Sequence, residues 1–173
     1  LKTQIIFSSS IQVTKNNAYG NSKRKCEKLL LDLKKKNGNN IFILRLPNIY
    51  GKWSKPNYNS VVATFCHNIS RKKKVYISDP NSNINLLYID DLIIKLKEYT
   101  KIGLKKKIIS LIKANDKIKL QQLYNTINSF EIGRTKKIIG NISKGLNSKL
   151  YSTYISFLPK NKMFIAFIYL ING

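Results

Sequence analysis

Two short apolar segments flank one long helical segment near the start of the chain, and this order constrains the fold most. Gln4–Ser8 and Ile41–Leu46 are rich in Ile, Leu and Phe, as expected of strands buried on two faces. Between them a helix is predicted from Ala18 to Lys36, where Asn37-Gly38 provides a stop signal. A strand–helix–strand unit of this length favours a parallel α/β sheet.

The rest of the chain continues the alternation of strands and helices. We predict a loop over 51–59, helices over 60–70, 90–100 and 120–130, and strands over 74–77, 85–89 and 108–112. A turn is expected at 79–81, and 141–149 resembles a linker. Ligands of parallel sheets bind at the carboxyl ends of the strands. Ser8–Ser10 and Pro47-Asn48 both follow predicted strands, so we expect them to line one crevice.

Composition indicates a globular protein, with 43% hydrophobic and 23% charged residues among 173. The net charge of +24 raises the alternative of a basic module that binds nucleic acid or another polyanion. However, 28 of the 32 basic residues are lysine, whereas base readout favours arginine. Lys, Ile and Asn together make up 74 residues, in every kind of position. We therefore interpret the charge as compositional drift and expect no nucleic-acid partner.

The sulfur and histidine content predicts a cytoplasmic protein without a metal site. Cys26 and Cys66 are isolated thiols, and His67 is the chain's one histidine, so neither a disulfide framework nor a zinc site is expected. We expect both thiols to be buried. Met163–Ile171 is apolar but far shorter than the ~20 residues that cross a bilayer, so no membrane partner is expected either. Because the sequence opens without Met, inside a predicted strand, we expect a fragment.

The candidate chemistry lies at the start of the first helix. Tyr19, Lys23, Cys26, Leu30 and Leu33 are spaced 4, 3, 4 and 3, so they share one face, which we predict to be buried. Tyr-x-x-x-Lys alone is uninformative, since ten Tyr and 28 Lys would supply such a pair by chance. The informative feature is its place between a strand ending in serines and a strand leading into Arg-Leu-Pro-Asn. The alternative is a lysine that extends to solvent.

This combination suits proton transfer coupled to hydride transfer. A free tyrosine has a pKa of about 10, too high for acid–base work at neutral pH. A neighbouring ammonium and an oxidised nicotinamide both favour the phenolate. A serine hydroxyl at the strand end would hydrogen-bond the substrate oxygen.

The stretches FSSS, YGNSK and RLPNIYG resemble the extended short-chain dehydrogenase/reductase family of nucleotide-sugar epimerases, dehydratases and reductases. SSSIQ, RLPNIYGKWSKPNYNSVVATFC, YIDDL and LYSTYISFLP resemble its bacterial capsular-polysaccharide and O-antigen subgroup. Those enzymes reduce UDP-linked 4-keto deoxy-amino sugars in the N-acetyl-L-fucosamine pathway. The resemblance implies NADP or NAD as cofactor, a UDP-sugar substrate and a homodimer.

The resemblance also implies residue roles at the cofactor. Ser10 matches the catalytic serine, with Ser9 the next candidate. Tyr19 matches the acid/base residue, and Lys23 the residue that binds the nicotinamide ribose and tunes the tyrosine. Ser8 and Pro47 match the remaining positions near the cofactor.

Substrate contacts follow in the same way. Asn48 matches a substrate-binding residue, and Asn59 and Ser60 match the segment that meets the nucleotide diphosphate, ordinary helix capping being the alternative. Trp53 and Tyr58 would either stack on sugar or uracil or pack against the protein. Arg45 is expected to support the fold.

Three departures from the family pattern shape the overall prediction. There is no glycine-rich phosphate loop, no arginine shortly before YIDDL, and no following metal-binding domain. We therefore predict the C-terminal part of a Rossmann-like α/β domain with a small substrate-binding lobe over 1–158, its N-terminal cofactor half missing. Residues 159–173 would be a divergent tail. An inactive gene remnant is a further alternative.

Overall fold

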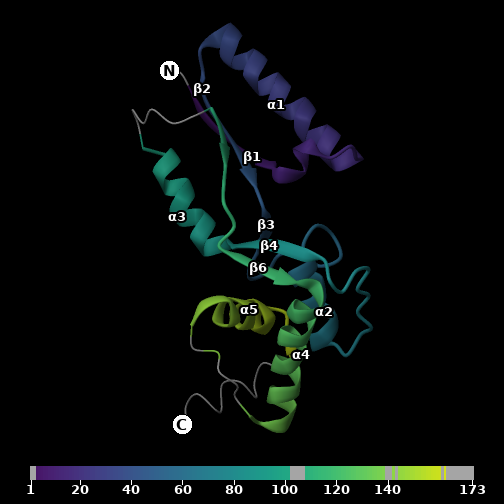
Figure 1. Cartoon of the computed structure of the whole chain (residues 1–173). Helices are drawn as coiled ribbons and strands as arrows, with labels where there is room; N and C mark the ends of the chain where they lie inside the picture. Colours follow the sequence, from purple (N-terminus) through teal and green to yellow (C-terminus); the bar gives the residue numbers. More distant parts are fainter. Residues whose placement is uncertain (1–2, 102–107, 139–141, 143, 161, 163–173) are drawn as a thin grey trace. The chain divides into compact units, whose positions relative to one another are not determined.

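The computed structural model describes residues 3–101, 108–138, 142, 144–160 and 162 (Figure 1). The chain divides into two compact units, each built from two separate segments. The first unit contains residues 1–47 and 90–114, and the second contains 48–89 and 115–173. Each unit has its own small sheet and is described by itself.

The sheet of the first unit is wholly parallel, as the sequence predicts. It contains β1 (Gln4–Ser10), β2 (Asn40–Leu46) and β5 (Ile109–Leu111), in the order β1-β2-β5. Ile6 lies opposite Phe42 across the first pair of strands. The predicted α/β class with parallel pairing is therefore confirmed.

Helices cover the two faces of this sheet, which explains the apolar run in β2. Arg45 contacts Glu27 of α1 (Ala18–Asn37), whereas the Phe42 ring packs on Tyr99 of α3 (Ile89–Tyr99) with centroids 5.4 Å apart. Because side chains alternate along a strand, odd positions of β2 face α1 and even positions face α3. Every residue from Ile41 to Leu46 except Arg45 is consequently buried.

Local signals fix the ends of α1. The Asn17 side chain accepts a hydrogen bond from the backbone N–H of Gly20, and Gly38 ends the helix with a left-handed φ of 65°. A short 3-10 helix, η1 (Ile11–Thr14), joins β1 to this start. A Cβ on Gly20 would lie 2.4 Å from the Gln12 carbonyl oxygen, so the two helices pack as closely as glycine allows.

The buried face of α1 differs from the prediction by one position. Cys26 is exposed, and the neighbouring Glu27 is buried instead, whereas Leu30 is half-buried as the predicted face requires. One residue rotates a helix face by 100°, and the lysine-rich sequence leaves the apolar stripe too weak to fix that angle. Of the two thiols expected to be buried, only Cys66 is.

The second unit combines a three-stranded sheet with helices. Its strands are β3 (Asn48–Tyr50), β4 (Asn83–Tyr88) and β6 (Asp116–Lys119), with β3 parallel and β6 antiparallel to β4. The helices are α2 (Val61–Ser70), α4 (Leu120–Lys136) and α5 (Gly145–Ser156). They enclose a core of apolar side chains that includes Phe65, Leu123, Ile127, Leu150 and Tyr154.

Two predictions for this unit are wrong, and one strand was missed. Residues 74–77 form no strand, because Lys73 and Lys74 hydrogen-bond to Asn68 at the end of α2 instead. The polar strand β6 was not predicted. Helix α5 begins at Gly145, inside the expected linker, because its apolar residues lie toward the core although Asn and Ser surround them. The expected turn at 79–81 is confirmed by a bond from the Asn81 N–H to the Asp79 carboxylate.

Further predictions concern membrane-spanning helices, metal sites and the C-terminal residues. In the part of the chain that is described, no helix is long and apolar enough to cross a membrane. No cluster of three or more potential metal ligands occurs within those same residues. The apolar segment 163–171 lies outside the described residues, so the predicted tail of 159–173 stays a prediction.

Candidate active site

Lys23 connects the first turns of α1 to the carboxyl end of β1. Its Nζ donates a hydrogen bond to the Ser8 carbonyl oxygen at 3.0 Å. The same ammonium lies 5.1 Å from the centroid of the Phe7 ring and 5.6 Å from that of Tyr19. The lysine therefore lies across the strand end rather than extending to solvent, which was the alternative interpretation.

The Tyr19 side chain lies beside the Lys23 ammonium and is exposed at the surface of the first unit. The residue is 38% exposed, and no hydrogen bond from another described residue occupies its hydroxyl. A phenol beside an ammonium, open on one side, can exchange a proton with a bound molecule. The structure thus brings Ser8, Tyr19 and Lys23 together, as the sequence predicts.

The three serines at the end of β1 differ in their environments. Ser9 is buried, and its hydroxyl donates to a Glu27 carboxylate oxygen at 2.5 Å. Strand alternation places Ser8 and Ser10 on the opposite face. Ser10 is 8% exposed, and its Oγ accepts a bond from the Gln12 N–H at 3.1 Å. In that contact the Ser10 oxygen is the acceptor, so its hydroxyl proton is available for another partner. Ser9 donates its proton to Glu27 and therefore has a structural role.

Glu27 is the important residue of this region that sequence reasoning missed. Its carboxylate receives bonds from Arg45 at 2.6 and 3.0 Å, in addition to that from Ser9. Burial alone raises the pKa of Glu27, but the hydrogen bonds and positive charge of Arg45, together with Ser9, lower it below its usual value. The expected supporting role of Arg45 is confirmed.

A sequence signal for Glu27 existed. It lies four residues after Lys23, so the two share a helix face, and acidic residues number only eight in the chain. A scarce carboxylate on the face that carries the candidate lysine indicates a structural partner for a basic residue. Its ion pair holds α1 against β1 and β2 and thereby fixes where Tyr19 and Lys23 lie.

The other predicted site residues are divided between the two units, with Pro47 in the first and Asn48, Asn59 and Ser60 in the second. Pro47 is buried directly after β2. In the second unit, the Asn48 side-chain amide donates to the Asn85 carbonyl at 3.1 Å. Ser60 caps α2 by accepting a bond from Ala63, as the capping alternative predicts, and Asn59 is exposed.

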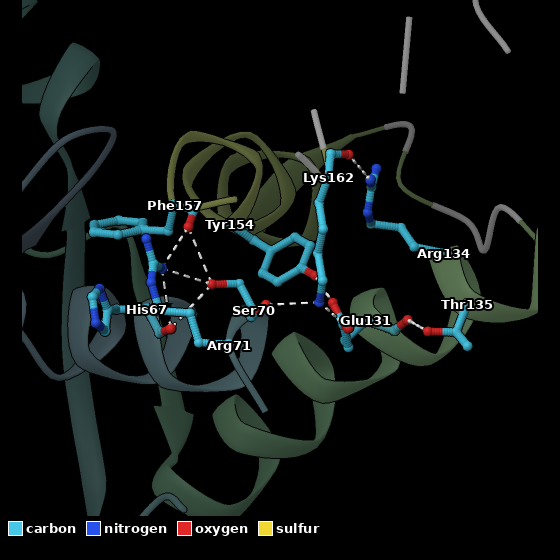
Figure 2. Close-up of polar contacts among 9 residues, drawn as sticks. All are labelled: His67, Ser70, Arg71, Glu131, Arg134, Thr135, Tyr154, Phe157 and Lys162. Atoms are coloured by element: carbon cyan, nitrogen blue, oxygen red, sulfur yellow. Dashed lines mark hydrogen bonds and ion pairs between the residues drawn. The ribbon is translucent and has the colours of Figure 1, made fainter. Parts of the chain in front are cut away.

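A second polar cluster lies among α2, α4 and α5 (Figure 2). Lys162 pairs with Glu131 at 2.9 Å and also donates to the Ser70 carbonyl, while Arg71 donates to the Phe157 carbonyl at 2.8 Å. These bonds attach Phe157 and Lys162, which follow α5, to α4 and to the end of α2.

The tyrosine of this cluster is unsuited to proton transfer. Tyr154 is fully buried and donates its hydroxyl to Glu131. Burial and the nearby carboxylate raise the pKa of Tyr154 well above its usual value. It remains a hydrogen-bond donor at neutral pH, and its cluster is structural.

Comparisons with known proteins identify the family. The model described as the NAD dependent epimerase/dehydratase family matches residues 2–95. The chain belongs to this family. The match includes β1, which carries the serines of the candidate site, and α1, which carries its tyrosine and lysine. The family resemblance read from the sequence is therefore confirmed, and NAD is the cofactor named for the family.

Two proteins match most of the chain. It is 38% identical over 157 residues to the UDP-2-acetamido-2,6-beta-L-arabino-hexul-4-ose reductase of Pseudomonas aeruginosa, covering 91% of the chain and 42% of that protein. Its sequence is also 35% identical to that of the capsular polysaccharide assembling protein CapF from Staphylococcus aureus. The chain superposes on the crystal structure of CapF with a TM-score of 0.81, covering 94% of the chain and 45% of CapF. The chain thus spans less than half the length of these relatives.

A solved structure with lower sequence identity shares the fold. UDP-glucose 4-epimerase from Thermotoga maritima superposes with a TM-score of 0.70 over 90% of the chain and 63% of the epimerase. The two sequences are only 18% identical, so this likeness shows the fold alone. The roles of the individual site residues stay predictions.

Proposed function

We propose that this chain carries the catalytic residues of an NAD(P)-dependent reductase or epimerase that acts on a UDP-linked 4-keto deoxy-amino sugar. The proposed enzyme is a cytoplasmic homodimer that acts in surface polysaccharide biosynthesis. Support comes from the Pseudomonas aeruginosa reductase and Staphylococcus aureus CapF, to which the chain is similar. The single observation that carries the proposal is the position of Lys23 between the Ser8 carbonyl and the Tyr19 ring.

Tyr19 is the proposed proton donor for the C4 oxygen of the keto sugar, and the nicotinamide supplies the hydride. The ammonium of Lys23 stabilises the phenolate that remains after the proton leaves. The hydroxyl of Ser10 donates to the same carbonyl oxygen, since its one described contact leaves the proton available. Asn48, Asn59 and Ser60 are the proposed contacts to the rest of the substrate.

The residues present fit a nicotinamide ribose. Lys23 has three N–H donors, and the Ser8 carbonyl uses one of them, so donors remain for ribose hydroxyls. Ser8 is exposed at the same strand end, and Pro47 directly follows the neighbouring strand β2. Lys23, Tyr19, Ser8 and Pro47 would therefore hold this end of the cofactor.

The test is reductase activity of the full-length natural protein, followed by the absorbance of the reduced nicotinamide with a UDP-4-keto sugar. Tyr19→Phe removes the proton donor and should lower kcat by about 10²- to 10⁴-fold. Tyr76→Phe is the matched control, because Tyr76 is also exposed, at 84%, and belongs to the second unit. Full activity of Tyr19→Phe would refute the proposed mechanism.

A further inference from the structure

The loop between β3 and α2 exposes two large aromatic side chains. Trp53 is 82% exposed and Tyr58 is 72% exposed. The packing alternative for these residues is therefore wrong. The loop also connects Asn48, at the start of β3, with Asn59 and Ser60, which precede α2. Its aromatic residues thus lie along the chain between the proposed substrate contacts.

The exposed rings stand on an anchored backbone. The Trp53 N–H donates to the Ser156 hydroxyl of α5 at 3.3 Å, and the Asn57 N–H donates to the Thr64 hydroxyl of α2 at 2.9 Å. A third bond joins the Ser54 hydroxyl to the Gly51 carbonyl. All these partners belong to the second unit. Bonds to two helices fix the loop while leaving both rings in water.

The backbone of the loop is strained where the tryptophan is presented. Trp53 has a φ of 60° and Asn57 a φ of 54°. Asparagine tolerates the left-handed region, but for a bulky residue such as tryptophan it is a genuine outlier. Strain of this kind concentrates at ligand clamps and active sites, where the surrounding structure maintains it. The contact to Ser156 is such a support.

Two lysine side chains lie in the same loop as the aromatic rings. The Lys55 ammonium lies 5.4 Å from the centroid of the Tyr58 ring, and Lys52 is exposed in the same loop. Aromatic faces bind nucleobases by stacking, and ammonium groups bind phosphate as point charges. A ligand with a flat base and a diphosphate matches both properties.

We propose that Trp53 and Tyr58 form a stacking site for the base of a nucleoside diphosphate, whose phosphates Lys55 neutralises. The choice of uracil as the base rests on the proposed function. Binding involves no chemical step and needs neither the nicotinamide nor Tyr19. The two proposals can therefore fail separately.

Ligand binding at Trp53 can be followed by intrinsic fluorescence, because Trp53 is the one tryptophan of the chain. The intrinsic fluorescence of the folded chain, with helix content checked by circular dichroism, would be titrated with UDP, uridine and pyrophosphate. UDP and uridine should quench the emission, and pyrophosphate should not. Equal quenching by pyrophosphate, or none by UDP, would overturn the stacking site.

Variants that keep the reporter test the remaining parts. Tyr58→Ala should weaken UDP binding by about 5- to 150-fold, the range for one stacked base, whereas Tyr76→Ala, another exposed tyrosine, should change nothing. Lys55→Met should weaken UDP binding more than uridine binding. Unchanged affinity in Tyr58→Ala and Lys55→Met would contradict the proposal.

A kinetic readout in the full-length protein separates the two proposals. There Trp53→Leu and Tyr58→Ala should raise KM for the UDP-sugar with little change in kcat, because they act on binding. An unchanged KM in both variants of an active enzyme would overturn the stacking site alone. Quenching by UDP in an enzyme whose Tyr19→Phe variant is fully active would overturn only the proposed function.

Discussion

Glu27 holds α1 to the two strands that it covers, so its replacement measures what fixes the candidate site. Glu27→Gln keeps the shape of the side chain but leaves Arg45 without its ionic partner. Removing one member of a fully buried pair costs about 3–5 kcal/mol, and an exposed pair contributes about 0–1 kcal/mol. The side chains here are 6% and 32% exposed, so we expect a loss of about 2–3 kcal/mol.

Urea unfolding followed by far-ultraviolet circular dichroism measures this loss. Asp32→Asn is the matched control, since it neutralises an exposed carboxylate of the same helix and should stay within about 0.5 kcal/mol of the wild type. Arg45→Met combined with Glu27→Gln should cost at least 1 kcal/mol less than the sum of the single changes, because the two residues contact each other.

The pH dependence gives an independent check. Because the folded state lowers the pKa of Glu27, its stabilisation is fully present above the usual value of 4.5 and disappears as the pH falls through the folded value. The difference between wild type and Glu27→Gln should therefore be constant near neutrality and shrink in acid. If Glu27→Gln unfolded like Asp32→Asn at neutral pH, the argument that this pair fixes α1 would be refuted.

Two further predictions concern packing. A thiol reagent should modify Cys26 rapidly in the native chain and Cys66 only after unfolding, because Cys66 is fully buried and burial raises its pKa; equal rates without denaturant would contradict this. Gly20→Ala should destabilise the chain by about 1–3 kcal/mol in urea unfolding, although alanine favours helices, because its Cβ would lie 2.4 Å from the Gln12 oxygen and 2.6 Å from the Lys15 oxygen. A gain in stability would show that these carbonyls move aside easily.

The elements that the sequence predicts well are those with strong local signals. The apolar run of β2, the stop at Gly38 and the cap at Ser60 each depend on a few neighbouring residues, and all lie where expected. The approach of Lys23 to the end of β1 follows from the strand–helix–strand order itself. Local sequence was therefore sufficient for the framework of the candidate site.

The errors fall where contacts distant in sequence decide. The strand β6 is short and polar, and only pairing with β4 makes it a strand. The rotation of α1 depends on Glu27 meeting Arg45, which lies 18 residues further along the chain. Neither partner is visible in a window of neighbouring residues, and the lysine-rich composition weakens the periodicity that would otherwise indicate the buried face.

The interleaving of the two units bears on how the chain is made. β2 pairs with β5 through residues such as Ile43 and Ile109, yet residues 48–89, which belong to the other unit, are synthesised in between. A ribosome adds about 5–20 residues per second, so this apolar strand edge stays open for several seconds in the cell. Unpaired edges of this kind invite association with other chains. Chaperone dependence during translation, and aggregation of chains that stop before Ile109, would follow from this order.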